Sequence, residues 1–549
     1  MIKSNDLTAK QIDSRFKHLK SGRSELDEVI KELSSLLYPY KGSKKSNMWD
    51  TTGSEACIKL SSLLSSLITP AGQRWHGLSE PYFSHQLDYL RGASDAKKIK
   101  EWCDAITDVL FSFRERSGSG FVSCLHAFYK SIVEVGTGCM YIEADVDNDG
   151  IEHGIRYIAV PLDSVYISVN HQNAVDSVYR KFKFTAEQIA HKWGEDALSS
   201  SMRASLEQKE DDKFNFIHAV YPKGIGRSKG FHSKFVCTDE SRFLEEKELS
   251  TLPYAIGRYS VRADEIYGKS PAMEALPAIR RLNEIQTELA KFSILSIQPP
   301  YNAVANSLQT KFKQEPRAIN YGAISKEGKE LFKPVPVGNP IPYYQEIERI
   351  EKSIQNMFLL NLFQILDDKA SRSAAESLEK TREKGAFVAP LLGGIQSEFI
   401  GMMIRRELDI LDLQKQLPEF GDLRIQVLKV EYTSPLFKYQ QAEVVASAFQ
   451  GANNLIELAI KSGNPEIMDY LDFETFPAFT LYRSGCPAQL ICDSKKVEEK
   501  RKERKNQMQQ MMEREKENEQ TKISNRIGEK VVQNEIKESV DHMRDSRNE

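Results

Sequence analysis

The sequence has no apolar run close to the roughly 18 residues that a membrane-spanning helix needs, so we expect no membrane span. Its first residues, MIKSNDLTAKQIDSRF, also lack the apolar core of a signal peptide. Cysteine is scarce, with 7 among 549 residues, and no C-x-x-C pair occurs. Cys486 and Cys492 stand close together, but no histidine lies near them to complete a zinc set. These absences predict free thiols in a reducing environment and no metal site.

An excess of basic charge and the common catalytic motifs are missing as well. The formal net charge is −3, which argues against a generally basic nucleic-acid-binding protein, although a locally basic surface stays open. Neither a G-x-S-x-G nucleophile elbow nor an H-E-x-x-H zinc motif occurs. The 78 acidic residues produce carboxylate pairs by chance, so their spacing nominates no acid and base. We therefore expect no enzyme, no catalytic residue and no cofactor.

The stretch EIYGKSPAM, which begins at Glu265, resembles the end of a phosphate-binding loop. That loop needs a glycine five residues before Gly268, where this chain has Ala263. Pro271 also lacks the N–H that would grip a phosphate in the first helical turn. The pattern instead predicts a turn at Gly268, Ser270 as the N-cap and Pro271 as the first residue of a long helix.

The stretch DVDNDG, from Asp145 to Gly150, matches the opening of a calcium-binding loop. The twelfth position should hold a bidentate glutamate but holds Arg156, and the flanking residues alternate like strands. A hairpin turn rich in Asp, Asn and Gly explains the same residues, so we expect a turn and no metal.

Hydrophobic periodicity divides the first half of the chain into helices followed by strands. Helices are predicted over about 7–38, 50–69, 96–115 and 120–134, where apolar residues recur three and four apart. From Gly138 the period changes to two, which predicts two strand pairs, CMYIEADVDNDGIEHGIRYIAV and SVYISVNHQNAVDSVYRKFKF. A short helix with a capping box at Thr185 and Gln188 follows, and then strands near 214–220 and 252–260. This order indicates an α+β fold.

The middle of the chain predicts two long helices around a proline-rich excursion. One helix runs over about 271–297, and residues 299–342 are irregular because they are rich in Pro and Gly. The second helix carries a narrow apolar seam suited to packing against another helix, formed by Ile347, Ile350, Ile354 and Met357. A further helix extends to about Leu417, with weak points at Pro390 and Gly393-Gly394. Together the two helices and the excursion predict a stalk with a tip.

The proline-rich excursion is locally basic. It holds six cations against Glu315, Glu327 and Glu330, which gives 6 − 3 = +3. A solvated loop would carry the same charge, and that alternative stays open because aromatic residues are sparse. The cations are Lys311, Lys313, Arg317, Lys326, Lys329 and Lys333.

The last third predicts a strand over 423–432 and helices over about 438–462 and 464–472. After Lys495 the chain is dense in charge, with Met508, Met511 and Met512 among charged and amide residues. Such a tail is expected to form an exposed helix or to be partly disordered.

Three stretches in this order resemble the portal proteins, the head-to-tail connectors of short-tailed, podovirus-like bacteriophages. The first is WDTTGSEACIKLSSLLSSLITPAGQRWHGL, which is similar to the family's N-terminal helix and its Pro-and-aromatic exit. The second is VEVGTGCMYIEAD with VYISVNHQNAVDSVYRKFKFTAEQI, which is similar to its strand block. The third is YGKS at the start of the long helix.

The resemblance implies a portal fold with an α/β wing, a two-helix stem, a Pro-rich clip and a helical crown. It also implies a ring, usually a dodecamer, at one capsid vertex, with DNA passing through its channel. The implied ranges are wing 1–270, first stem helix 271–298, clip 299–342, second stem helix 343–365, tunnel loop 366–374, long helix and strand of the wing 375–435, crown 436–490 and charged tail 491–549.

The resemblance further implies partners and residue roles. The clip would dock the terminase packaging motor and then the tail adaptor, and Lys369 and Arg372 would be the cations of the tunnel loop. Double-stranded DNA would pass without sequence specificity, and the other partners would be capsid and scaffolding protein, with assembly in the host cytoplasm and no membrane. The apolar seams of the stem would pack between subunits, through Leu282, Leu289, Ile347, Ile350, Ile354 and Met357.

Two alternatives remain. One is a helical scaffold or adaptor of a virion that does not conduct DNA. The other is a nucleotide-dependent packaging enzyme, which would need the intact phosphate-binding loop that this sequence lacks.

Overall fold

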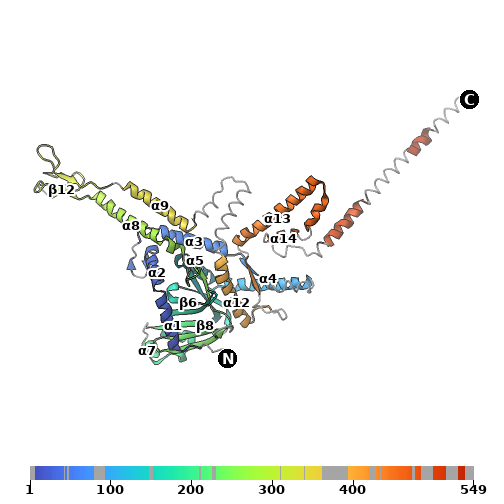
Figure 1. The fold of residues 1–549 in the computed structure, drawn as a ribbon, viewed down its shortest axis with the longest axis horizontal. Helices are drawn as coiled ribbons and strands as arrows, with labels where there is room; N and C mark the ends of the chain where they lie inside the picture. The colour runs from blue at the N-terminus through green and yellow to red at the C-terminus, as the bar shows by residue number, and fades with distance from the viewer. Residues whose placement is uncertain are drawn as a thin grey trace. The chain divides into compact units, whose positions relative to one another are not determined.

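A computed structural model describes most of the chain, and it divides into two compact units, Met1–Gln440 and Gln441–Glu549 (Figure 1). The described residues are 6–41, 44–45, 48–79, 93–146, 152–208, 212–224, 230–308, 311–338, 340–360, 393–418, 428–432, 435–472, 476–483, 497, 499–512, 514, 530–537 and 539.

The first unit opens with helices, and the helical stretch expected over 7–38 consists of two helices that meet at Arg23. Helix α1 (Ala9–Gly22) starts with a capping box between Thr8 and Gln11, and α2 (Ser24–Leu37) follows directly. The side chain of Arg23 is buried and donates hydrogen bonds to the carbonyl oxygens of Leu162 and Val165. These partners lie about 140 residues away, so the position of the Arg23 side chain depends on tertiary contacts. The elements that follow are β1 (Tyr40–Lys41), β2 (Lys44–Lys45), α3 (Thr52–Ile68), β3 (His76–Ser79), α4 (Ala93–Glu115) and α5 (Phe121–Val135).

Two antiparallel sheets form the strand block. One has the order β11-β4-β5 and the other β10-β9-β8-β7-β6. The two predicted strand pairs are β4 with β5 and β6 with β7, while β9 and β10 were not predicted. The bounds are β4 (Thr137–Val146), β5 (Glu152–Val160), β6 (Val165–Val169), β7 (Val175–Thr185), α6 (Ala186–Trp193), α7 (Ser200–Gln208), β8 (Lys213–Pro222), β9 (Phe231–Cys237), β10 (Arg242–Leu249) and β11 (Tyr254–Arg258), with short 3-10 turns at Leu162–Ser164 and Glu195–Ala197.

The acidic stretch from Asp145 to Gly150 falls between β4 and β5. These strands pair antiparallel as far as Val146 and Glu152, so the hairpin interpretation is confirmed, although residues 147–151 lie outside the described residues. Arg156 donates to a carboxylate oxygen of Asp145 at 3.1 Å. Arg156, at the position that would hold the last calcium ligand, therefore forms an ion pair with Asp145, the first residue of the stretch.

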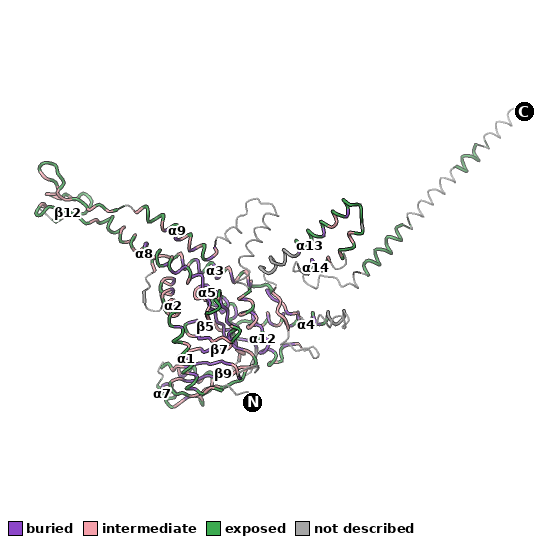
Figure 2. The backbone as a smooth tube through the Cα atoms, in the orientation of Figure 1, coloured by how far each residue is buried: buried purple, intermediate pink, exposed green. Residues whose placement is uncertain are grey.

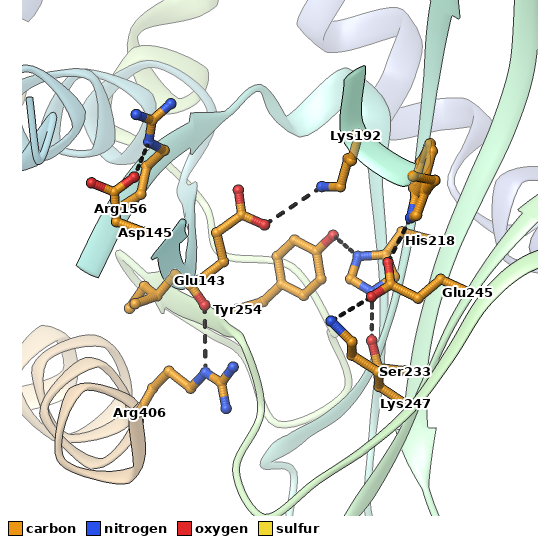
Figure 3. Close-up of polar contacts among 12 residues, drawn as sticks. Glu143, Asp145, Arg156, Lys192, His218, Ser233, Glu245, Lys247, Tyr254 and Arg406 are labelled. Atoms are coloured by element: carbon orange, nitrogen blue, oxygen red, sulfur yellow. Dashed lines mark hydrogen bonds and ion pairs between the residues drawn. The ribbon is translucent and has the colours of Figure 1, made fainter. Parts of the chain in front are cut away.

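A buried histidine connects the two sheets (Figure 3). Nδ1 of His218, on β8, lies 2.6 Å from the Tyr254 hydroxyl on β11. Nε2 of the same ring lies 2.9 Å from the Ser233 hydroxyl on β9. The Phe235 ring stacks on the imidazole at a centroid distance of 3.8 Å. Burial, with the nearby Lys192 and Arg180 charges, lowers the pKa of His218 well below its ordinary value of 6.5. A neutral imidazole therefore joins the sheets, and its serine and tyrosine contacts have a structural role because all three side chains are buried.

The largest core lies where α3, α5 and the sheet β11-β4-β5 meet α12 (Gly401–Leu413). The helix before α12 was expected to weaken at Gly393-Gly394, but both residues are helical and the irregularity is a π-helix at Gln396–Ile400. Phe399 of this π-helix stacks on Phe128 at 3.6 Å, and Glu398 receives two hydrogen bonds from Arg258. Strand β14 (Lys429–Tyr432) pairs with β3.

A fully buried ion pair crosses the same core. The Arg114 guanidinium on α4 binds both carboxylate oxygens of Glu407 on α12, at 2.9 and 2.5 Å. The Tyr157 hydroxyl donates to the same carboxylate at 2.6 Å, and His76 Nε2 lies 2.6 Å from Arg114. Burial and the Arg114 charge lower the pKa of His76 well below 6.5. One arginine thus holds α4, α12 and β3 together.

The second unit is helical in the part that the structure describes. Helix α13 (Pro435–Ser462) crosses the boundary between the units, and α14 (Phe476–Arg483) and helical stretches at 499–512 and 530–537 follow. The helix expected over 464–472 is a 3-10 helix at Pro465–Tyr470. A search of the described helices for a membrane-spanning segment finds none with sufficient length and hydrophobicity.

Candidate functional site: the stem and the clip

The candidate site is the pair of long helices with the segment that joins them. Helix α8 (Pro271–Ile297) and helix α9 (Ile341–Met357) pack side by side, and α3 contacts both (Figure 1). We call α8 and α9 the stem. The clip, residues 299–342, joins them, and its last two residues form the start of α9.

The stem begins where the backbone at Gly268 lies directly against the backbone at Gly136. A Cβ built on Gly268 would lie 2.2 Å from the carbonyl oxygen of Gly136, and a Cβ on Gly136 would lie 2.1 Å from that of Gly268. Gly136 also has a left-handed φ of 75°. The Gly268 N–H donates to the Thr137 hydroxyl at 3.0 Å, which fixes the crossing. Gly268 is therefore required for close backbone approach to the end of α5.

The next residues start α8 as predicted. The Ser270 hydroxyl accepts from the Met273 N–H at 3.0 Å and donates to the Glu134 carbonyl at 2.8 Å, and Pro271 is the first helical residue. The Lys269 ammonium lies 2.8 Å from the Glu265 carboxylate four residues earlier. The Gly-Lys-Ser sequence is thus a helix start with a local ion pair, and the predicted helix start is confirmed.

The predicted apolar seam holds the two helices of one chain together. Leu282, Ile347, Ile350 and Ile354 are buried within the chain itself, Leu289 is half-buried and Met357 is 39% exposed. The buried members belong to the largest core. The resemblance assigned this seam to contacts between subunits, but its buried side chains are packed within one chain.

The far half of the stem exposes a different set of large apolar side chains. No residue of α8 beyond Ile285 and none of α9 before Ile347 is buried (Figure 2). At 100° per residue, Ile297, Ile294 and Leu295 cover about 160° of the α8 surface. Exposed apolar side chains therefore lie on more than one side of the helix pair. We call this set the exposed stem residues: Ile294, Leu295, Ile297, Ile341, Tyr343 and Tyr344, each 46–73% exposed.

The clip has a small aromatic core of its own. Strands β12 (Tyr301–Ala303) and β13 (Phe332–Pro334) pair antiparallel. The rings of Tyr301, Phe312 and Phe332 lie 4.4–4.8 Å apart, centroid to centroid. The Asn320 side chain also bonds to both backbone polar groups of Lys313, at 2.8 and 2.9 Å. These contacts give a segment without regular helix a defined conformation.

All six predicted clip cations are exposed: Lys311, Lys313, Arg317, Lys326, Lys329 and Lys333. Lys329 pairs with Glu327 at 3.8 Å and Lys333 with Glu330 at 3.4 Å, on exposed side chains. Exposed apolar side chains lie among them, namely Val304, Ile319, Tyr321 and Ile324. The clip surface is therefore both basic and apolar, a composition suited to contact with another macromolecule.

The remaining sequence predictions fall elsewhere. Lys369 and Arg372 of the predicted tunnel loop lie outside the described residues. Sequence reasoning missed the exposed stem residues, although the apolar residues at 294–297, shortly before two prolines, were a visible signal. The described residues contain no cluster of His, Cys, Asp and Glu that could hold a metal ion.

The described part of the chain combines a mixed helical and sheet body with the two stem helices and the clip that joins them. The family of bacteriophage head to tail connecting proteins matches residues 9–491, and the chain belongs to this family. It therefore acts in a phage particle, at the junction of head and tail.

Two relatives are similar over nearly their whole length. The "Portal protein" of Salmonella phage epsilon15 is 25% identical over 513 residues, covering 88% of this chain and 89% of that protein. The "Probable portal protein" of Bordetella phage BPP-1 is 22% identical over 514 residues, covering 89% and 90%.

Solved particle structures resemble the chain more distantly. One is titled "Virion of native gene transfer agent (GTA) particle", with 12% identity, a TM-score of 0.35 and coverage of 76% of this chain and 88% of that chain. Another is titled "Neck of native GTA particle computed with C12 symmetry", with 13% identity, a TM-score of 0.32 and coverage of 70% and 94%.

Proposed function

We propose that copies of this chain form a closed ring at one capsid vertex, with the stems surrounding a channel for duplex DNA. Genomic DNA enters through this channel during packaging and leaves through it during ejection. Twelve copies is the expected number, as in the family that the sequence resembles. The head-to-tail family match and the two portal relatives support this function.

The exposed stem residues carry the proposal. A ring of identical subunits uses a heterologous interface, in which each subunit contacts its two neighbours through two different patches. Such a subunit must present apolar surface on two sides. On α8 this apolar surface consists of Ile294 and Ile297, 64% and 73% exposed, together with Leu295. On α9 it consists of Tyr343 and Tyr344. In a ring these side chains become buried between neighbouring stems.

The clip is the docking surface for the terminase motor and later for the tail adaptor. Its six cations, which outnumber its three acidic residues, suit an acidic partner surface. Tyr321 and Ile324 supply the apolar contact area beside them. ATP hydrolysis then belongs to the motor, because Lys269 is engaged by Glu265 at a helix start.

The tunnel loop, residues 366–374, projects into the channel and meets DNA through Lys369 and Arg372. A net charge of −3 for the chain favours sliding, because extensive phosphate pairing would retard the DNA. Residues 1–270 and 375–435 form the wing, which contacts capsid and scaffolding protein, and residues 436–490 form the crown. Assembly takes place in the host cytoplasm before the particle is complete.

Electron microscopy of the purified chain tests the proposal. The natural protein should form rings with a central hole, and Ile294→Asp/Ile297→Asp should give monomers with an unchanged circular dichroism spectrum. Leu413→Asp is the matched control, because Leu413 is 73% exposed but lies at the end of α12. A protein that stays monomeric under all conditions, or double-variant rings as stable as the natural ones, would refute the ring interface.

A further inference from the structure

The charged tail contains a helix with two chemically different faces. Residues 499–512 are helical, and every one of them is exposed. At 100° per residue, Lys500, Arg501, Arg504 and Lys505 fall within an arc of about 140°. The opposite side carries Glu499, Glu503, Asn506, Gln509 and Gln510, with Lys502 as its single cation. We call the four cations of the first arc the basic face.

The basic face is a local feature of the second unit. The six residues from Lys500 to Lys505 hold five cations and one acid, which gives 5 − 1 = +4. The preceding residues 436–490 hold three cations, Lys438, Lys461 and Arg483, against six acids, which gives 3 − 6 = −3. General basicity of the chain therefore does not explain this concentration of positive charge.

The spacing of the cations brings like charges together. Lys500 and Arg504, and likewise Arg501 and Lys505, are four residues apart and adjacent on the helix surface. Like charges at this spacing destabilise an isolated helix. A polyanion bound along this face would remove the repulsion, so binding and helix stability support each other.

We infer that the basic face binds the phosphate backbone of duplex DNA without sequence preference. Lys500 and Arg504 are separated by four residues, about 6 Å along the helix axis at 1.5 Å per residue. A DNA strand presents a phosphate about every 3.4 Å along its axis, so four cations in this arc can each meet a phosphate. The inference rests on the proposed function only in that DNA is the polyanion present at a portal.

The apolar part of the same arc argues against a membrane as the partner. Met508, Met511 and Met512, 54–70% exposed, continue this arc beyond the cations. An interfacial membrane helix places Trp, Phe or Leu opposite its charges along its whole length. Here the turns that carry the cations contain no apolar residue at all. The tail is thus a DNA-binding element separate from the stem.

Equilibrium binding of a fluorescently labelled mixed-sequence duplex to the full-length protein tests the inference. Four phosphate contacts predict that affinity falls on the order of 100-fold between about 50 and 200 mM salt. Lys500→Gln/Arg501→Gln/Arg504→Gln/Lys505→Gln should weaken binding at least about tenfold at the lower salt and flatten the salt dependence. The matched control is Lys311→Gln/Lys313→Gln/Arg317→Gln/Lys326→Gln in the clip, which removes the same charge and should bind within about twofold of the natural protein.

Two further measurements separate the alternatives. Met508→Gln/Met511→Gln/Met512→Gln should bind the duplex as the natural protein does, and phosphatidylglycerol vesicles should compete poorly with DNA. The inference would be overturned if the tail and clip variants lost DNA affinity equally, or if the methionine variant bound DNA more weakly than the natural protein. Stronger binding to the vesicles than to DNA would also overturn it. Negative-stain images of the same samples report the ring independently, so rings with unaltered DNA binding in the tail variant refute this inference and leave the proposed function intact.

Discussion

Gly136 and Gly268 lie in direct backbone contact, so that a methyl group on either would come within 2.2 Å of the other's carbonyl oxygen. Gly136 ends α5 and Gly268 precedes α8, and the contact sets the point at which the stem leaves the body. Tyr259 adds a hydrogen bond from its N–H to the Gly136 carbonyl at 2.8 Å. The entry of the stem is therefore fixed by backbone on both sides.

Replacing either glycine should unfold this junction. We expect Gly268→Ala to destabilise the protein by about 3 kcal/mol or more, because the neighbouring atom is backbone and cannot move aside. Gly22→Ala, where a Cβ meets nothing within 4 Å, should be neutral or slightly stabilising. Thermal unfolding and the soluble yield of the three proteins measure this, and a Gly268→Ala protein with the natural midpoint would contradict the close contact.

Substitutions at Ser270 and Lys269 should distinguish a helix start from a nucleotide-binding loop. Ser270→Ala removes the N-cap acceptor of α8 and should cost about 1 kcal/mol of stability, in the usual range for an N-cap. Lys269→Ala should leave stability within about 0.5 kcal/mol, because its ion pair is local and partly exposed to solvent, and should leave DNA packaging in infected cells unchanged. A packaging defect from Lys269→Ala in a stably folded protein would revive a phosphate-binding role.

The buried pair of Arg114 and Glu407 should be destabilising when only one partner is lost. Arg114→Met leaves the Glu407 carboxylate buried with Tyr157 alone and should cost about 3–5 kcal/mol. The double variant Arg114→Met/Glu407→Leu should be more stable than the single variant, because no buried charge remains. Arg280→Met, which breaks an exposed pair with Glu32, is the control and should cost less than about 1 kcal/mol. Chemical denaturation compares the four proteins, and a double variant no more stable than Arg114→Met would contradict the coupling.

Acid should destabilise the sheets through His218. Its pKa is lowered in the folded protein, so below about pH 6.5 the unfolded chain binds a proton that the folded chain does not. The stabilising contribution is complete above pH 6.5 and is lost as the pH falls below it, by up to about 1.4 kcal/mol per pH unit. His218→Gln should therefore show a smaller fall in unfolding temperature between about pH 7.5 and 5.5, although it starts lower. His76→Gln should behave similarly, and an unchanged pH dependence in both variants would exclude these histidines as its source.

Local signals in the sequence were enough for several elements. The Ser270-Pro271 start of α8, the capping box at Thr185 and the alternation of β4 with β5 depend on residues within a few positions of each other. Caps, proline and alternation act over one turn or one strand pair, so the chain pattern contains the complete physical cause. The order of these elements also carried the resemblance that the family match confirms.

Other features depend on partners that are remote in sequence, and only the folded chain decided them. The Arg23 side chain, between α1 and α2, is held by carbonyl groups about 140 residues away, and Gly136 is constrained by Gly268. The sequence presented the seam through Ile350 and the cluster at Ile294 as similar apolar patterns. Tertiary packing buried the first in the chain's own core and left the second exposed. The physical reason is that a hydrophobic residue specifies burial without specifying its partner, and the partner is set by which surfaces meet when the whole chain folds.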